Sequence, residues 1–233
     1  VARNRLCGNA EKPIARGAGY GIPFITPGEE VAMHLQTKTV SALDETSIRG
    51  LIVIDAAETC LASDGDRFLG AVSNALVGNS IETPVFRVEA YVELQSFVQC
   101  LAAVAGRAKV EINGVECGAW RALPVPAGGE VRVLARDEAV YLAFSGLSGR
   151  MGLVRPGERF YVNPVDDFGV ELAARYVPPS LLNEYFSGGA QDALLERILR
   201  HIRLACEMAR RGAKLVRVKV GGKVFDVWVE EVG

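Results

Sequence analysis

The pattern of apolar and polar residues changes twice along the chain. Residues 1–49 are rich in glycine and proline and predict an irregular arm, with a strand over 37–40. "RGLIVIDAA" (49–57) then predicts a buried strand. In "DGDRFLGAVSNALVG" (64–78) apolar residues recur at helical spacing, which predicts one helix near 66–77.

From this helix to about residue 162 the pattern predicts strands and turns. "FRVEAYVEL" alternates between apolar and polar residues, and "CLAAVAG" is a continuous apolar strand. "KVEING" ends in the pair Asn113-Gly114, which suits a hairpin. "EVRVLARDEAVYLAFSG" predicts two strands around a tight turn at 136–138. Short strands at this spacing, with few helices, indicate a barrel or sandwich.

The last third of the chain has a different pattern. Residues 192–212 predict an amphipathic helix that ends at Gly212, and 214–231 predict a hairpin around Gly221-Gly222. The apolar stripe of this predicted helix comprises Leu195, Leu199, Ile202, Cys206 and Ala209, and it is widened by Leu194, Ile198 and Ala205. Because an isolated hairpin is marginally stable in water, we expect both elements to pack on the barrel or on a second copy.

Composition and charge narrow the classes of function. The chain has 233 residues, of which 49% are hydrophobic and 23% charged, which is typical of a globular protein. A net charge of −2 argues against a nucleic-acid partner. No apolar run reaches the length of a membrane span, so none is predicted.

The five cysteines and two histidines carry little chemistry by themselves. The cysteine count is odd and no pair has C-x-x-C spacing, which favours reduced thiols in a cytoplasmic protein; the alternative is one bridged pair. With only His34 and His201, a metal site built on several histidines is excluded, and no metal is predicted. His201 lies between two arginines, so we expect it in solvent.

One segment resembles a known family. "FLGAVSNALVGN" followed by "PVFRVE" is similar to the helix-and-strand corner of the carboxyltransferase-domain family, which contains allophanate hydrolase subunit two, one of the 5-oxoprolinase subunits, and KipA. The family pattern A-x-x-x-A-N-x-L-V-G-N is matched by Asn74, Leu76, Val77, Gly78 and Asn79. "AAVAGRAKVEINGVECGAWRALPVPAGGEVRV", "EAVYLAFSGLSG" and "GLSGRMGLVRPGERF" resemble later family blocks in the same order, so the resemblance covers roughly residues 50–162.

The resemblance implies a mainly β (α+β) protein. We expect the arm over 1–49, a cyclophilin-like β-barrel over 50–165, and a C-terminal helix plus β-hairpin over 166–233. The chain departs from the family in three places, the first of which is the missing G-A-M-D stretch before the first asparagine. The T-T-G-G-Y-P loop of the family's second half is absent, and Gly149 stands where the family's S-D-R-M-G has aspartate. The chain therefore resembles a shortened homologue.

Two functions follow from the resemblance. The first is a subunit of a two-component amide-hydrolase-like complex, of the 5-oxoprolinase or allophanate-hydrolase type, acting on a small amide or lactam. The alternative is a non-catalytic binding or regulatory module that pairs with a KipI-like protein. Either implies a KipI-like or allophanate-hydrolase-subunit-one-like partner, and a homodimer is also expected. ATP, if used, belongs to the complex, because no cofactor is expected on this chain alone; whether the chain is an enzyme stays open.

Candidate catalytic residues lie in one loop. Asp64, Asp66 and Arg67 belong to a segment that resembles the family's V-Q-D-x-G-R loop. The two carboxylates suit orientation of a substrate amide or proton transfer, and the arginine suits substrate binding. The alternative for the aspartates is capping of the following helix.

Three further residues are candidates for substrate binding. Arg150 suits bidentate binding of a carboxylate, although a surface arginine is the alternative. Tyr141 lies on a strand, where a core or rim role is the alternative. Asn79 either binds a ligand or stabilises the corner, because asparagine tolerates left-handed backbone and hydrogen-bonds nearby main chain. We expect the cleft where the Asp64–Arg67 loop meets the "GLSGRMG" segment.

Overall fold

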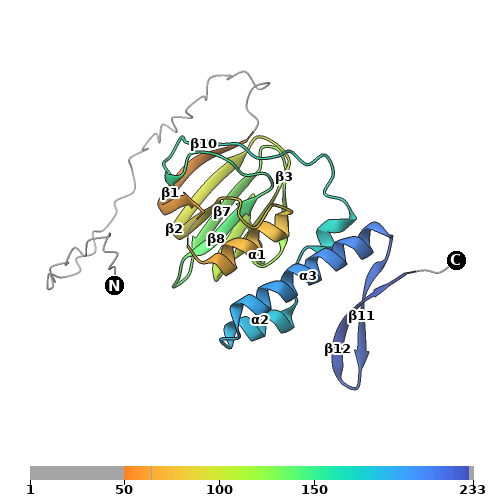
Figure 1. Cartoon of the computed structure of the whole chain (residues 1–233). Coiled ribbons are helices and arrows are strands. Elements are labelled where there is room, and N and C mark those ends of the chain that lie inside the picture. The colour runs from red at the N-terminus through yellow and green to blue at the C-terminus, as the bar shows by residue number, and fades with distance from the viewer. Residues whose placement is uncertain (1–49, 64, 231–233) are drawn as a thin grey trace, which may run out of the picture. The chain divides into compact units, whose positions relative to one another are not determined.

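The computed structural model describes residues 50–63 and 65–230 (Figure 1). The predicted arm, its strand at 37–40, His34 and Asp64 lie outside the described residues. The strands of the barrel are β1 (Leu51–Ala62), β2 (Val85–Ser96), β3 (Cys100–Ala105), β4 (Ala108–Ile112), β5 (Val115–Cys117), β6 (Ala122–Val125), β7 (Glu130–Ala135), β8 (Val140–Phe144), β9 (Gly152–Leu153) and β10 (Arg159–Phe160). The other elements are α1 (Arg67–Val77), η1 (Val170–Ala174), α2 (Pro179–Phe186), α3 (Gln191–Arg210), β11 (Lys214–Val220) and β12 (Lys223–Val229).

The ten strands β1 to β10 form one antiparallel sheet that curls into a nearly closed barrel. The sheet runs in the order β5-β4-β7-β2-β8-β3-β6, and β1 pairs with β2, β9 and β10. Two register shifts in the β1–β2 pairing bend these long strands, and Glu58 has a φ of 48° at one of them. Phe86 sits at the centre of the interior, edge-on to Phe144 and Phe160. The predicted mainly β fold class is confirmed.

Strands β3 and β8 are buried on both faces, which explains the continuous apolar pattern of "CLAAVAG". Val104 and Leu142 belong to the cluster inside the barrel. Ala103, Ala143 and Tyr141, which alternate with them, belong to a second cluster that includes α1 and α3. Figure 1 shows both helices lying along this side of the barrel. Tyr141 therefore points toward α1 and away from the interior.

The two strands predicted on either side of 136–138 are present as β7 and β8, but the turn between them does not reverse the chain. β7 and β8 both run antiparallel to β2, β7 against residues 91–95 and β8 against 86–88. The two strands therefore follow one another along the same edge of β2. The connection that shifts the chain from one strand to the next contains Asp137, which has a φ of 66°. By contrast, the Asn113-Gly114 hairpin is confirmed: both residues have positive φ, and β4 pairs with β5.

Helix α3 is amphipathic as predicted, but its buried stripe is rotated. Leu194 and Ile198 lie fully inside the second cluster, whereas Leu195 and Leu199 are only half-buried. The helix ends in a Schellman motif: the N–H of Gly212 donates to the carbonyl of Ala209, and the N–H of Ala213 donates to the carbonyl of Met208. Gly212 has a φ of 83°, so its predicted role at the helix end is confirmed.

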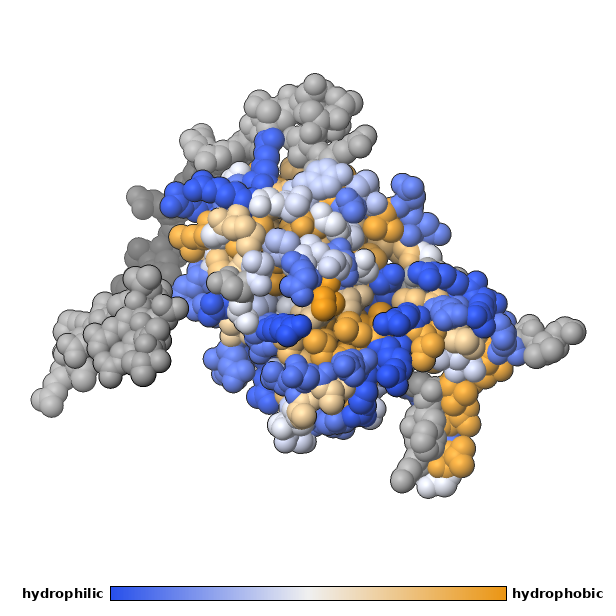
Figure 2. Space-filling model, viewed as in Figure 1, coloured by the Kyte–Doolittle hydropathy of each residue, from blue (hydrophilic) through white to orange (hydrophobic). Residues whose placement is uncertain are grey.

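The β11–β12 hairpin turns at Gly221-Gly222, as predicted, and pairs in register from Lys214↔Val229 to Val220↔Lys223. Trp228 packs against the second cluster. The opposite face is apolar and exposed, and Figure 2 shows hydrophobic residues gathered on the hairpin. These exposed residues are Val216, Val218, Val220, Val227 and Val229.

Cysteine and histidine environments differ in part from expectation. Among the described cysteines, Cys100 and Cys117 are free thiols, and Cys7 lies outside the described residues. The expectation that His201 is solvated is wrong. Its ring packs edge-on against Tyr176 at 5.2 Å, its Nε2 is buried, and burial lowers the pKa of His201. His201 lies on the side of α3 that packs against the segment around η1, although charged residues surround it in the sequence.

Alkaline pH should destabilise the barrel through Cys100. Burial raises the pKa of this thiol to about 11 from 9.0, while its hydrogen bond with Ser96 Oγ acts in the opposite direction. Because the raised pKa favours the neutral thiol in the folded state, its stabilisation is complete below about pH 9 and is lost toward pH 11. We expect urea unfolding to show a loss of about 2 kcal/mol over this window that Cys100→Ala lacks. An equal pH dependence in the variant would contradict this assignment.

Candidate functional site

A hollow of about 340 Å³, here called the α1 hollow, lies between the N-terminal half of α1 and the ends of β1 and β2. Small residues make much of its wall, among them Ala62, Gly65, Gly70 and Ala71. Its polar groups come from three places in the sequence: the loop before α1, α1 itself, and the turn before β2. With the tyrosine of β8, they are Ser63, Asp66, Arg67, Asn74, Glu82, Thr83 and Tyr141.

The Tyr141 hydroxyl joins β8 to the loop before α1. The backbone N–H of Asp66 donates to Tyr141 Oη at 2.6 Å. Tyr141 is only 4% exposed and still reaches the hollow, because Gly65 leaves room for it. A Cβ at Gly65 would lie 2.5 Å from Tyr141 Oη, and Gly65 has a φ of 137°. Glycine is therefore required here both for its backbone conformation and for its size.

Asp66 is the N-cap of α1. Its Oδ1 accepts hydrogen bonds from the N–H groups of Phe68 and Leu69, at 2.9 and 3.0 Å. Capping, the alternative to a catalytic role for this residue, is therefore what the side chain does.

Asn74 and Asn79 hold the corner between α1 and β2. Asn79 Nδ2 donates to Asn74 Oδ1 and to the Phe144 carbonyl, and Asn79 Oδ1 accepts from the N–H of Gly146. Asn74 Nδ2 donates to the Thr83 carbonyl at 2.7 Å. Both asparagine side chains are thus engaged within the protein. These contacts are those of the structural role considered for Asn79.

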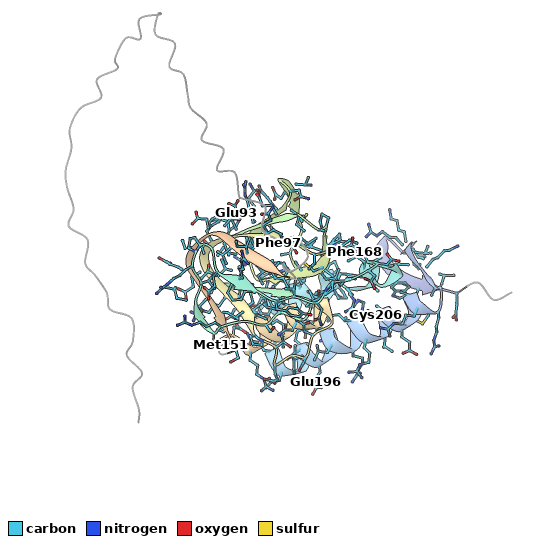
Figure 3. The ribbon with its side chains drawn as sticks, turned by 90° about the horizontal axis from the view of Figure 1, so that it is seen from above. Glu93, Phe97, Met151, Phe168, Glu196 and Cys206 are labelled. Atoms are coloured by element: carbon cyan, nitrogen blue, oxygen red, sulfur yellow. The ribbon has the colours of Figure 1, made fainter. Side chains whose placement is uncertain are left out.

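The end of the "GLSGRMG" segment lies beside the strand that leads into the loop before α1. β9, which directly follows Met151, pairs with β1 at Cys60 and Leu61, just before the loop that carries Asp66. Arg67 lines the α1 hollow, but Arg150 does not. Arg150 is exposed and immediately precedes Met151, which is labelled in Figure 3, in the segment before β9. The structure therefore brings together Asp66, Arg67 and Tyr141, and leaves Arg150 apart.

A second hollow, here called the α2 hollow, was not predicted from the sequence. It measures about 310 Å³ and is lined by residues including Arg107, Glu138 and Tyr185. No sequence motif marks it, because its residues come from α1, from two barrel turns and from the stretch that runs from the end of α2 to the start of α3. The salt bridge between Glu93 and Arg132, at 3.2 Å, lies away from the helices: Figure 3 shows Glu93 on the other side of the barrel from α3.

Metal ligands do not cluster in the part of the chain that the structure describes: it contains no group of three or more histidine, cysteine, aspartate or glutamate residues able to hold an ion. The polar groups of the α1 hollow are instead suited to an organic ligand. Arginine and glutamate supply opposite charges, and the tyrosine hydroxyl supplies a neutral donor.

Several solved structures resemble the chain at low identity. TTHA0988 is 18% identical over 52% of this chain and 32% of its own, with a TM-score of 0.46. The Kluyveromyces lactis urea carboxylase is 17% identical, with coverage of 49% and 14% and a TM-score of 0.42. The urea amidolyase of the same organism is 16% identical, with coverage of 57% and 11% and a TM-score of 0.45.

The matched region spans about a third or less of each of these three neighbours. No protein-family model and no curated protein matches the sequence. Among residues 50–63 and 65–230, no helix is long and apolar enough to cross a membrane.

Proposed function

We propose that the chain is the ligand-binding subunit of a two-component amide-hydrolase-like complex, and that its α1 hollow holds a small amide or lactam that carries a carboxylate. The proposal rests on the hydrogen bonding of the Tyr141 hydroxyl. Its oxygen accepts from the Asp66 N–H, and no described residue accepts its hydrogen. The hydroxyl can therefore donate to a ligand carbonyl, polarised by the bond that it already accepts.

Arg67 and Glu82 supply the other contacts. Both are exposed, both line the hollow, and neither forms a salt bridge with a described residue. A guanidinium binds a carboxylate through paired hydrogen bonds, and a carboxylate accepts an amide N–H. A cyclic amide with one carboxylate satisfies both groups and the Tyr141 hydroxyl together.

The non-catalytic alternative is favoured by a specific contact. The Asp66 carboxylate, expected to act in catalysis, accepts two backbone N–H groups as a helix cap. Both hydrogen bonds engage Oδ1 and hold the side chain in its capping position at the start of α1. We infer that the chain alone binds its ligand without turning it over, and that any hydrolysis requires the KipI-like partner and ATP.

Calorimetry with 5-oxoproline tests the binding proposal. We expect heat from the wild-type chain, and binding about tenfold weaker in Tyr141→Phe, because one hydrogen bond to the ligand is lost. Tyr161→Phe is the control, since this exposed tyrosine does not line the hollow. If wild type gives no heat with or without the partner, binding of this lactam is excluded. If the partner mixture hydrolyses ATP only when 5-oxoproline is present, the catalytic function gains over the regulatory one.

Gly70→Ala should separate stability from binding. Gly70 lies inside α1, where glycine is about 1 kcal/mol less favourable than alanine. A Cβ would lie 3.8 Å from Val85 Cγ2 and 3.9 Å from Tyr141 Cδ1, which are ordinary contacts. We therefore expect alanine to raise the free energy of unfolding by about 0.5–1 kcal/mol while it narrows the α1 hollow and weakens 5-oxoproline binding. Increased stability with unchanged binding would place the ligand elsewhere.

A further inference from the structure

The α2 hollow has an apolar wall with a fixed geometry. The Tyr185 ring stacks on Phe68 with centroids 4.9 Å apart and planes 3° from parallel. Trp120 packs against Tyr185 at 5.4 Å and against Phe186 at 6.1 Å. Phe186 nevertheless remains 46% exposed. The aromatic side chains are held by one another, so the wall needs little reorganisation to receive an apolar group.

Two opposite charges face this wall from neighbouring turns of the barrel. Arg107 belongs to the β3–β4 turn, and its guanidinium carbon lies 5.0 Å from the centroid of the Phe186 ring. Glu138 belongs to the β7–β8 connection, which is tied to the first turn by the hydrogen bond from the Arg136 N–H to the Arg107 carbonyl. Neither charged side chain forms a salt bridge with a described residue.

Both charges affect the pKa of the Tyr185 hydroxyl. Burial raises the pKa of Tyr185, the nearby Asp66 and Glu138 carboxylates raise it further, and Arg107 lowers it. The phenol therefore stays protonated near neutral pH. The phenol can therefore act as a hydrogen-bond donor in the hollow that Arg107 and Glu138 also line, and Gln191 lines the same hollow.

We propose that the α2 hollow binds a free α-amino acid with an apolar or aromatic side chain. The carboxylate pairs with Arg107, the ammonium pairs with Glu138, and the side chain lies on Phe186 and Tyr185. A zwitterion matches this hollow because it brings both countercharges at once, whereas a simple anion or cation leaves one protein charge without a partner. The volume of about 310 Å³ accommodates one such molecule. This site shares no residue with the α1 hollow and does not depend on the function proposed for it.

The test uses the full chain with L-phenylalanine and two analogues. 3-Phenylpropionate lacks the ammonium, and phenethylamine lacks the carboxylate. Fluorescence of Trp120, only 7% exposed and in contact with Tyr185 and Phe186, reports occupancy of the hollow in a Trp228→Phe background. We expect L-phenylalanine to bind at about millimolar concentration and each analogue to bind about tenfold more weakly.

Substitutions of Arg107 and Glu138 test which protein charge binds which charged group of the amino acid. Arg107→Gln should abolish the preference for L-phenylalanine over phenethylamine, and Glu138→Gln should abolish the preference over 3-phenylpropionate. Arg136→Gln and Asp137→Asn are matched controls on the same connection that do not line the hollow, and both preferences should survive in them. The proposal is overturned if L-phenylalanine does not bind, if the analogues bind equally well, or if the Arg107 and Glu138 variants keep the wild-type preferences. Binding of 5-oxoproline in the α1 hollow should be unchanged in both variants.

Discussion

Asn79→Ala is expected to lower the free energy of unfolding by about 3 kcal/mol, because three side-chain hydrogen bonds disappear together. The amide donates to the Phe144 carbonyl and to Asn74 Oδ1, and accepts from the N–H of Gly146. Truncation leaves the Gly146 N–H and Asn74 Oδ1 without these partners in a largely buried corner, while the Phe144 carbonyl keeps the N–H of Leu147 at 3.2 Å. An unsatisfied buried group costs more than the net value of the bond that it lost.

Urea unfolding of Asn79→Ala and Asn183→Ala measures this effect. Asn183 lies exposed on α2, where replacement by alanine should change stability by less than about 0.5 kcal/mol. Asn79→Asp is a sharper variant. It keeps the size but replaces the donating amide with a carboxylate that faces two acceptor oxygens, so it should be at least as destabilising as alanine. A loss below about 1 kcal/mol in both Asn79 variants would show that water replaces these contacts.

The elements themselves were predictable because their signals are local. Helical periodicity marks α1 and α3, and paired residues with positive φ mark the hairpins at Asn113-Gly114 and Gly221-Gly222. Pairing partners are not local. β7 and β8 follow one another along β2, and nothing in residues 136–138 distinguishes such an offset from a reversal. The expectation for His201 was wrong for the same reason, because its neighbours in space come from η1.

The candidate site was predicted only where a motif ran along the chain. Asp66 caps a helix that begins at Arg67, so the place of both residues at its N-terminus followed from capping rules. The inward or outward direction of Tyr141 required knowing which face of β8 meets α1. Gly65 and Gly70 define the α1 hollow through absent side chains, which leaves no chemical signal in the sequence. The α2 hollow is assembled from four separate segments, so no single stretch of sequence indicates it.

Gly65→Ala should impair both folding and ligand binding, by about 3 kcal/mol in stability and at least tenfold in affinity for 5-oxoproline. The new Cβ would lie 2.5 Å from Tyr141 Oη and 3.2 Å from two ring carbons, so the tyrosine or the loop must move. Movement of either breaks the hydrogen bond between the Asp66 N–H and the hydroxyl, and takes the donor out of its position in the α1 hollow.

The variant Gly152→Ala separates the effect of backbone strain on stability from the effect of this steric clash. Gly152 has a φ of 118°, close to the 137° of Gly65, but a Cβ there would meet no atom within 4 Å. The Gly152 variant should therefore lose only the cost of a strained backbone, about 1–2 kcal/mol, and keep its affinity for 5-oxoproline. The double variant Gly65→Ala/Tyr141→Phe removes the atom that clashes, so it should be more stable than the sum of the two single changes by about 1 kcal/mol. Strict additivity, or equal losses of stability in the Gly65 and Gly152 variants, would mean that the loop adjusts without disturbing Tyr141.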